Sequence, residues 1–360
     1  AIKKVSERIK TVDRGQVLMA CGTGKTLTSL WIKEKINAEQ VLVLVPSLSL
    51  LSQILKEWNA EANKSFKWIC VCSDQSVAKD KSEDEWISNT SEIGVPVTND
   101  TLEIKNFLDE SGSKVVFSTY QSAPLIADSQ KHHDTSDFDL VIADEAHRCA
   151  GKVSDAFGCV LDDKKIRSTK RLFFTATPRI LSYQLKTKAS NNNIAVASMD
   201  DPSVFGEVLH QIKFSDAISQ KPPLLSDYQV IIVGVDDPMI RSKINNRDFL
   251  STDGKNVITA DTLSSIIALS KTIKKYKLKR VITFHNKVKS AKKFAQNLSH
   301  IISWIPESDK PKEIVESDYV SGEMNSKERN KKLTKLKNLE KNSIRVISNA
   351  RCLSEGIDVP

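Results

Sequence analysis

The sequence predicts an α/β protein with two parallel sheets that follow one another along the chain. Apolar runs of strand length alternate with helical stretches, which is typical of parallel strands whose connecting helices cover both faces of a sheet. With 360 residues, 40% of them hydrophobic, the chain is long enough to fill two cores. The predicted strands are residues 16–20, 41–45, 68–72, 114–118, 138–143 and 170–175, then 228–235, 280–284, 318–321 and 343–348.

The clearest break in this pattern is Lys221-Pro222-Pro223, where we expect the linker between two domains. The polar stretch 73–92 is predicted to be a surface insertion, because it offers few apolar side chains to a core. Residues 237–258 are predicted to form a loop-rich insertion before a helix at 260–276. The predicted domains are residues 1–223 and 224–360.

The string MACGTGKT joins the first predicted strand to a helix that begins at Lys25. Gly22 and Gly24 let the backbone turn tightly and approach phosphate oxygens, and N–H groups at the helix start face the same way. Lys25 can neutralise the β- and γ-phosphates of ATP, and the Thr26 hydroxyl can bind Mg²⁺. Met19 stands where the general pattern has Gly or Ala, so the loop is a variant. The predicted ATP-binding residues are Met19, Ala20, Cys21, Gly22, Thr23, Gly24, Lys25 and Thr26.

The tetrad Asp144-Glu145-Ala146-His147 follows a nearly continuous apolar run, typical of a parallel strand buried on both faces. Open α/β sheets bind ligands at the carboxyl ends of such strands. Asp144 is expected to bind Mg²⁺ together with Thr26, and Glu145 to orient or deprotonate the attacking water. His147 is expected to relay contacts between the nucleotide and the neighbouring domain. Together the two motifs predict ATP hydrolysis, with Lys25, Asp144, Glu145 and His147 as the predicted catalytic residues.

The net charge of +8 is unevenly distributed along the chain. Residues 226–360 hold 25 Lys and Arg against 16 Asp and Glu, whereas the first 225 residues hold 28 against 29. Solvated helix faces are one explanation, but beside an ATP motor a surface that follows nucleic-acid phosphates is the better one. Few aromatic residues interleave with the lysines, which favours duplex DNA over a single strand stacked on aromatic rings. The basic clusters are residues 271–280, 287–293 and 327–337.

The spacing of residues in the sequence argues against a zinc site, a nuclease site and a membrane span. The six cysteines lack paired spacing, so reduced thiols are expected rather than a zinc site. Glu103 and Lys105 form an E-x-K with Asp100 nearby, but the surrounding apolar spacing is helical and no nuclease is predicted. No apolar run reaches the length of a membrane span and no signal peptide is visible, which predicts a cytoplasmic protein without a membrane partner.

The motifs occur in an order that resembles the superfamily 2 helicases and translocases along the whole chain. Met19 at the start of the phosphate loop and the form of motif V are closest to the motors of type I and type III restriction enzymes and of single-chain restriction–modification enzymes. The string DRGQVLMACGTGKT points to the single-chain group most of all. The further matching strings are VLVLVPSLSLLSQ (motif Ia), FSTYQS (Ib/Ic), FTATPR (III), RVITFHNKV (IV), YVSGEM (the next strand) and RVISNARCLSEGIDVP (V).

This resemblance implies two RecA-like domains in tandem, the second truncated, that act as an ATP-dependent DNA translocase or helicase. The implied coupling residues are Thr175, Ala176, Thr177, Glu355, Gly356 and Asp358. The implied nucleic-acid contacts are Pro46, Ser47, Thr119, Tyr120, His285 and Asn286. The implied partners are double-stranded DNA and the nuclease, methyltransferase or specificity domains of a larger polypeptide.

The chain departs from the family pattern at both ends. It lacks the upstream Gln-containing element that reads adenine, and it stops before motif VI, whose arginine fingers contribute about 10³–10⁵ in rate. We therefore expect these residues to be a fragment that binds ATP better than it turns ATP over. Two alternatives stay open: a strand-separating DNA or RNA helicase, and an ATP- and DNA-binding fragment without turnover.

Overall fold

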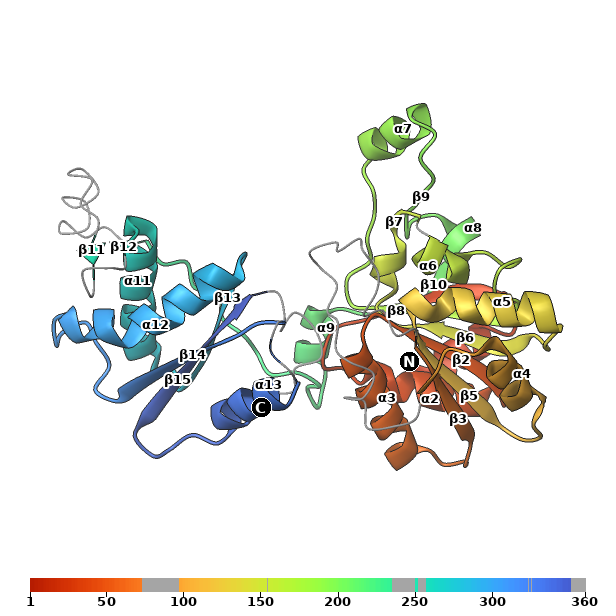
Figure 1. Ribbon diagram of the computed structural model, residues 1–360, viewed down its shortest axis with the longest axis horizontal. Coiled ribbons are helices and arrows are strands. Elements are labelled where there is room, and N and C mark those ends of the chain that lie inside the picture. The colour runs from red at the N-terminus through yellow and green to blue at the C-terminus, as the bar shows by residue number, and fades with distance from the viewer. Residues whose placement is uncertain are drawn as a thin grey trace. The chain divides into compact units, whose positions relative to one another are not determined.

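The computed structural model describes residues 1–72, 97–153, 155–234, 250–251, 257–322, 324 and 326–350. These residues divide into two compact units, the first ending at Tyr228 and the second beginning at Gln229 (Figure 1). Each unit has its own parallel sheet and its own apolar clusters, as the sequence predicts. Among the helices in these ranges, none is long and apolar enough to cross a membrane.

The first unit is built on an eight-stranded sheet in the order β10-β1-β8-β6-β2-β5-β3-β4, with parallel pairing throughout. All six strands predicted for this half are present, and β4 and β10 extend the sheet at its edges. β2 and β5 are buried along their whole length, as expected for central strands. The strands are β1 (Arg14–Met19), β2 (Gln40–Val45), β3 (Lys67–Val71), β4 (Val97–Thr98), β5 (Lys114–Thr119), β6 (Phe138–Ala143), β8 (Ser168–Thr175) and β10 (Glu207–Ile212).

Two apolar clusters cover the two faces of this sheet. On one face Trp58 of α3 packs edge-on against Phe117 of β5, with ring centroids 5.5 Å apart. On the other face Phe173 of β8 packs against Phe205 of α8 at 5.1 Å. The helices are α1 (Ile2–Arg8), α2 (Lys25–Lys35), α3 (Leu48–Glu61), α4 (Thr101–Asp109), α5 (Ala123–His133), α6 (Asp155–Gly158), α7 (Tyr183–Asn191), α8 (Pro202–Phe205) and α9 (Phe214–Ser219).

Short elements complete the first unit. Three of them are 3₁₀ helices, and the strands β7 and β9 form a small antiparallel pair. Figure 1 shows α7 standing away from the body of the unit, on the segment that leads from β8 to β9. These elements are η2 (Tyr120–Ser122), η3 (Ala146–Cys149), η4 (Cys159–Leu161), β7 (Gly151–Lys152) and β9 (Val196–Ala197).

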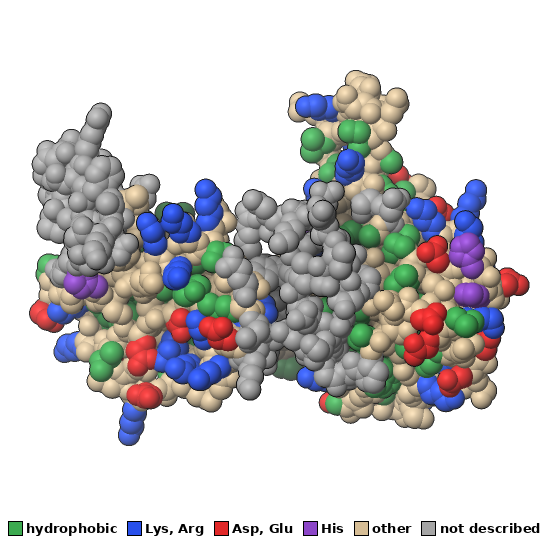
Figure 2. Space-filling view, viewed as in Figure 1, with side chains coloured by type: hydrophobic (Ala, Val, Ile, Leu, Met, Phe, Trp, Pro, Cys, Tyr) green, Lys and Arg blue, Asp and Glu red, His purple; other side chains and the backbone are tan. Residues whose placement is uncertain are grey.

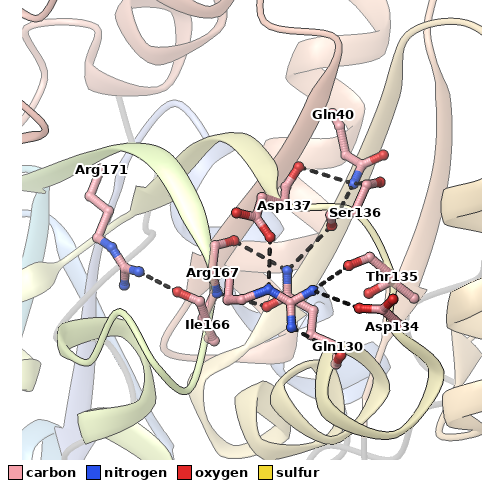
Figure 3. A network of polar contacts seen from close by, with 9 residues as sticks. All are labelled: Gln40, Gln130, Asp134, Thr135, Ser136, Asp137, Ile166, Arg167 and Arg171. Carbon is pink, nitrogen blue, oxygen red and sulfur yellow. Dashed lines mark hydrogen bonds and ion pairs between the residues drawn. The ribbon is translucent and has the colours of Figure 1, made fainter.

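A polar network joins Gln40 of β2 to residues that lie just before β6 and just before β8 (Figure 3). The Arg167 guanidinium, just before β8, donates to Asp137 Oδ1 at 2.7 Å and to the carbonyl of Gln130 at 3.1 Å. Gln40, the first residue of β2, donates to Ser136 Oγ at 2.9 Å. These bonds hold β2, β6 and β8 in register at one end, so the loops at their other ends start from fixed positions.

The second unit has a three-stranded parallel sheet in the order β13-β15-β14. The predicted helix at 260–276 is confirmed as α11 (Ala260–Tyr276), which packs with α12 in one apolar cluster. Strands predicted at 280–284, 318–321 and 343–348 are confirmed. The elements are β11 (Leu250–Ser251), β12 (Val257–Ile258), β13 (Arg280–His285), α12 (Val288–Trp304), β14 (Ile314–Val320), α13 (Ser326–Lys337) and β15 (Ser343–Ala350).

The prediction of a strand at residues 228–235 is wrong for the part of this range that the structure describes. Residues 228–234 have no regular structure, and the side chains of Val230 and Ile232 are 80% and 94% exposed. An apolar run predicts a strand only if a neighbouring strand can pair with its backbone, and none pairs with it among the described residues. The predicted insertion at 73–92 and most of that at 237–258 lie outside the described residues.

Candidate nucleotide site

The loop between β1 and α2 has the backbone that a phosphate cradle requires. Gly22 and Gly24 have φ of 80° and 81°, in the left-handed region that favours glycine. A Cβ on Gly24 would meet no atom within 4 Å, so its conformation, not space, calls for glycine there. The Ala20 N–H donates to the Ile212 carbonyl of β10 at 3.1 Å, which fixes the start of the loop to the sheet edge.

A continuous line of contacts joins this loop to two other strand ends. Lys25 Nζ donates to Glu145 Oε1 at 2.6 Å, in an ion pair whose side chains are 12% and 15% exposed. The other carboxylate oxygen of Glu145 lies 3.3 Å from His147 Nδ1, which lies 3.0 Å from Thr175 Oγ1. The Thr177 N–H in turn donates to Thr175 Oγ1 at 3.2 Å. The structure therefore brings together predicted residues from the segments that follow β1 and β6 and from the end of β8.

The electrostatics of the ion pair favour its charged form. Burial alone would raise the pKa of Glu145, but the hydrogen bond from His147 and the charge and hydrogen bond of Lys25 outweigh it and lower the pKa to about 2. Burial likewise works against the charged form of Lys25, yet the charges of Glu145 and Asp144 raise its pKa above the ordinary value. At neutral pH both groups are ionised and bound to each other.

Glu145 adopts a conformation that its residue type seldom takes. Its φ of 49° and ψ of 45° are left-handed, which costs a non-glycine residue about 1–2 kcal/mol. The preceding peptide is held at both ends, because its N–H donates to Asp144 Oδ1 at 3.0 Å and its carbonyl accepts from Tyr120 at 2.7 Å. This fixed peptide directs the Glu145 side chain toward Lys25.

The predicted metal ligands suit magnesium in kind. Thr26 offers a hydroxyl and Asp144 a carboxylate, both hard oxygen donors of the type that Mg²⁺ binds together with substrate phosphates. Within the described ranges, no group of three His, Cys, Asp or Glu side chains could hold a metal by itself. The donor set therefore fits a magnesium ion that arrives with a nucleotide.

Residues 1–180 match the family model described as "Type III restriction enzyme, res subunit", which is half of the chain. The chain belongs to this family. Residues 262–360 match the helicase conserved C-terminal domain. The resemblance to superfamily 2 motors of restriction enzymes is therefore confirmed, as is the pair of RecA-like domains.

This member of the res-subunit family is also similar to three longer proteins. The probable helicase A859L of African swine fever virus (isolate Pig/Kenya/KEN-50/1950) is 26% identical over 86% of this chain and 31% of its own length. The ATP-dependent type ISP restriction-modification enzyme LlaBIII, solved bound to DNA, superposes with a TM-score of 0.80 and 29% identity, over 99% of this chain and 24% of that one. The type ISP enzyme LlaGI, in complex with a DNA substrate mimic, shares the fold with a TM-score of 0.64 and 24% identity over 96% of this chain and 24% of that one. The chain thus spans about a third of the viral relative and about a quarter of each solved chain.

The residues predicted to contact nucleic acid in the first unit lie at the ends of two neighbouring strands, β2 and β5. Pro46 and Ser47 follow β2, and Ser47 begins α3 by accepting a hydrogen bond from the Leu50 N–H. Thr119 ends β5 with 6% of its surface exposed, and Tyr120 follows it with 0% exposed. Tyr120 is therefore buried as a whole residue, with its side chain turned into the core.

In the second unit, His285 ends β13 and Asn286 follows it exposed. The His285 ring packs on Phe294 with centroids 4.9 Å apart, and burial lowers its pKa. The coupling residues predicted at Glu355, Gly356 and Asp358 lie outside the described residues, whereas Ala176 lies half-buried between Thr175 and Thr177.

Sequence reasoning missed one residue that supports the loop. The buried indole of Trp58 in α3 donates from Nε1 to the Thr26 carbonyl at 3.1 Å, and so holds the first turn of α2. Its signal in the sequence is only an aromatic residue at helical spacing in ILKEWN, which a plain core position would explain equally well.

Proposed function

We propose that this helicase-type chain is the ATP-hydrolysing motor of a DNA translocase that acts in restriction–modification or phage defence. The observation that carries the proposal is the line of contacts Lys25–Glu145–His147–Thr175. It links the lysine predicted to bind phosphate to a carboxylate that can act as general base, and that carboxylate to Thr175, one of the implied coupling residues. The family match and the likeness to an ATP-dependent restriction enzyme support this reading.

The proposed mechanism starts from the Lys25–Glu145 ion pair. ATP phosphates would replace Glu145 as the partner of Lys25, and the freed carboxylate could then orient and deprotonate a water. His147, in contact with both Glu145 and Thr175, would carry that change to the strand end at β8. Mg²⁺ bound by Thr26 and Asp144 would neutralise phosphate charge.

Duplex DNA is the proposed partner, and the start of α12 is its proposed contact in the second unit. Some lysines of this unit are paired with acidic neighbours, such as Lys271 with Asp309 at 3.3 Å and Lys279 with Glu313 at 2.5 Å. The basic cluster 287–293 differs, because no acidic side chain among the described residues pairs with its lysines. Those lysines are Lys287, Lys289, Lys292 and Lys293.

Figure 2 agrees with this distribution. In the unit that carries α12, Lys and Arg side chains on the upper part of the view lack acidic neighbours, while basic and acidic side chains mix below. Lys287 is the N-cap of α12, and the first turn of that helix has no acidic residue. Lysines at the positive end of a helix dipole are unfavourable unless an anion binds there, which favours a phosphate contact.

The test of the enzymatic proposal is ATP hydrolysis by the full-length protein with and without duplex DNA. We expect duplex to stimulate hydrolysis and Lys25→Ala to abolish the stimulated rate. Lys35→Ala is the matched control, because Lys35 is an exposed lysine in the last turn of the same helix. Stimulation that survives Lys25→Ala would overturn the proposal.

A strand-separating helicase is the second candidate, since the likeness to viral and restriction proteins includes both helicases and DNA motors. A triplex-displacement assay run beside a duplex-unwinding assay separates the two activities. A translocase displaces the third strand and leaves the duplex paired. Unwinding of the duplex would instead assign the strand-separating function.

A further inference from the structure

Tyr120 connects two parts of the first unit that the sheet keeps apart. It is the first residue of η2, directly after Thr119 at the end of β5, where the family resemblance implies a nucleic-acid contact. Asp144 follows β6, and β2 lies between β5 and β6 in the sheet. Two strand spacings amount to about 10 Å, so only a long side chain can bridge these ends.

The Tyr120 side chain makes this bridge completely out of solvent. Its hydroxyl donates to the Asp144 carbonyl at 2.7 Å, and its ring stacks on Phe157 of α6 with centroids 5.1 Å apart and planes 22° apart. The hydroxyl also bonds the buried Cys149 thiol in η3, just past His147. With an exposed fraction of 0%, the side chain cannot itself touch DNA.

The accepting carbonyl belongs to the peptide that sets the Glu145 backbone. Rotation of the Asp144–Glu145 peptide plane changes ψ of Asp144 and φ of Glu145 together. Since φ of Glu145 is 49°, an unfavourable value for this residue type, the surroundings must hold the peptide in place. Tyr120 holds its oxygen while Asp144 Oδ1 holds its N–H.

We propose that Tyr120 is a positioning residue that couples DNA binding at the end of β5 to ATP hydrolysis, by fixing the Asp144–Glu145 peptide through its hydroxyl. The inference rests on the proposed function. A displacement of Thr119 by a bound phosphate backbone moves Tyr120 with it, and the hydroxyl passes that movement to the peptide that aims Glu145.

The experiment uses Tyr120→Phe in the full-length protein, which removes the hydroxyl and keeps the ring. Hydrolysis is measured with and without duplex, together with KM for ATP and Kd for duplex. We expect the DNA-stimulated kcat to fall about five- to tenfold more than the unstimulated kcat, the size of one lost neutral hydrogen bond. KM for ATP and Kd for duplex should stay within about twofold, because the hydroxyl touches neither ligand.

Tyr183→Phe is the matched control, since the Tyr183 side chain is 82% exposed on α7. It should leave the ratio of stimulated to unstimulated rate unchanged. An unchanged ratio in Tyr120→Phe, or an equal fall in both rates, would overturn the inference while the proposed function stands. A parent protein that duplex does not stimulate would instead overturn the proposed function.

A second variant applies if Tyr120→Phe does not fold. Phe157→Leu keeps the hydroxyl but removes the stacked ring that aims it. It should lower the same ratio, by a smaller factor than Tyr120→Phe would. A ratio equal to that of the parent protein in Phe157→Leu would contradict the inference.

Discussion

Glu145→Gln tests whether the ion pair in the nucleotide site competes with ATP. The pKa of Glu145 is about 2, against an ordinary value of 4.5. At about 1.4 kcal/mol per pKa unit, the ionised carboxylate contributes on the order of 3 kcal/mol to folding. Its side chain is only 15% exposed, so solvent screens little of this. If ATP binds through Lys25 as proposed, it takes Lys25 away from Glu145, and part of that energy is lost when the nucleotide binds.

The glutamine variant removes this competition. Glutamine at this position keeps the size of the side chain but gives up the charge, so Lys25 is already available to phosphate. We expect Glu145→Gln to bind ATP about tenfold more tightly or better, the equivalent of at least about 1.4 kcal/mol. Turnover should fall about 10²- to 10⁴-fold, because the proposed general base is lost. Equilibrium binding of a fluorescent ATP analogue and steady-state hydrolysis measure the two effects.

Without nucleotide, Glu145→Gln should lower the stability of the fold, and the size of this loss should depend on pH. A carboxyl with a lowered pKa stabilises the fold fully above pH 4.5 and loses that contribution as pH falls toward 2. The parent should therefore be more stable than Glu145→Gln at neutral pH, and the difference should shrink below pH 4.5. Glu61→Gln, at the exposed end of α3, is the control for loss of one carboxylate. ATP affinity unchanged or weakened in Glu145→Gln would refute the competition between Glu145 and phosphate.

Two further predictions concern other lysines. Lys289→Gln with Lys293→Gln should weaken duplex binding and reduce the slope of log Kd against log salt by about 1–2, whereas Lys271→Gln, already neutralised by Asp309, should change the slope little. Lys33 is 2% exposed, with Ser113 Oγ at 2.9 Å as its partner, and burial lowers its pKa. Lys33→Met should raise the free energy of unfolding by about 1 kcal/mol at neutral pH, and the gain should vanish as pH rises past 10.5, which urea titrations at several pH values would detect. No gain at neutral pH would show that the buried charge costs nothing.

The sequence predicts which residues lie together at the candidate nucleotide site, because these residues stand at or just past strand ends. Parallel strands end at one edge, so Lys25, Glu145 and Thr175 are close once β1, β6 and β8 are recognised as buried strands. The order of the strands is not visible in the sequence, because the apolar patterns of β2, β5 and β6 are alike. The sequence therefore predicts that Lys25 and Glu145 lie at the same edge of the sheet, but it does not predict that they are in contact.

Features that depend on a partner element were the ones that sequence reasoning missed. The apolar run at 228–234 has the composition of a strand, yet no described strand pairs with it. Tyr120 follows a strand like any surface residue of a loop, and only the packing of Phe157 and the Asp144 carbonyl turns it inward. A basic cluster in the sequence does not show which of its lysines are paired, because Asp309 and Glu313 neutralise lysines that are distant in the chain.

The strand order places Glu145 between the proposed ATP site and the proposed DNA contacts. Along the carboxyl edge, β1 and β8 carry the phosphate loop and Thr175, whereas β2 and β5 carry the proposed DNA contacts. β6 lies between these pairs, and neighbouring strands are only about 4.8 Å apart. His147 reaches from the end of β6 toward β8, and Tyr120 reaches toward it from β5. A displacement that begins on either side therefore needs to pass only one side chain to change the direction of the Glu145 carboxylate.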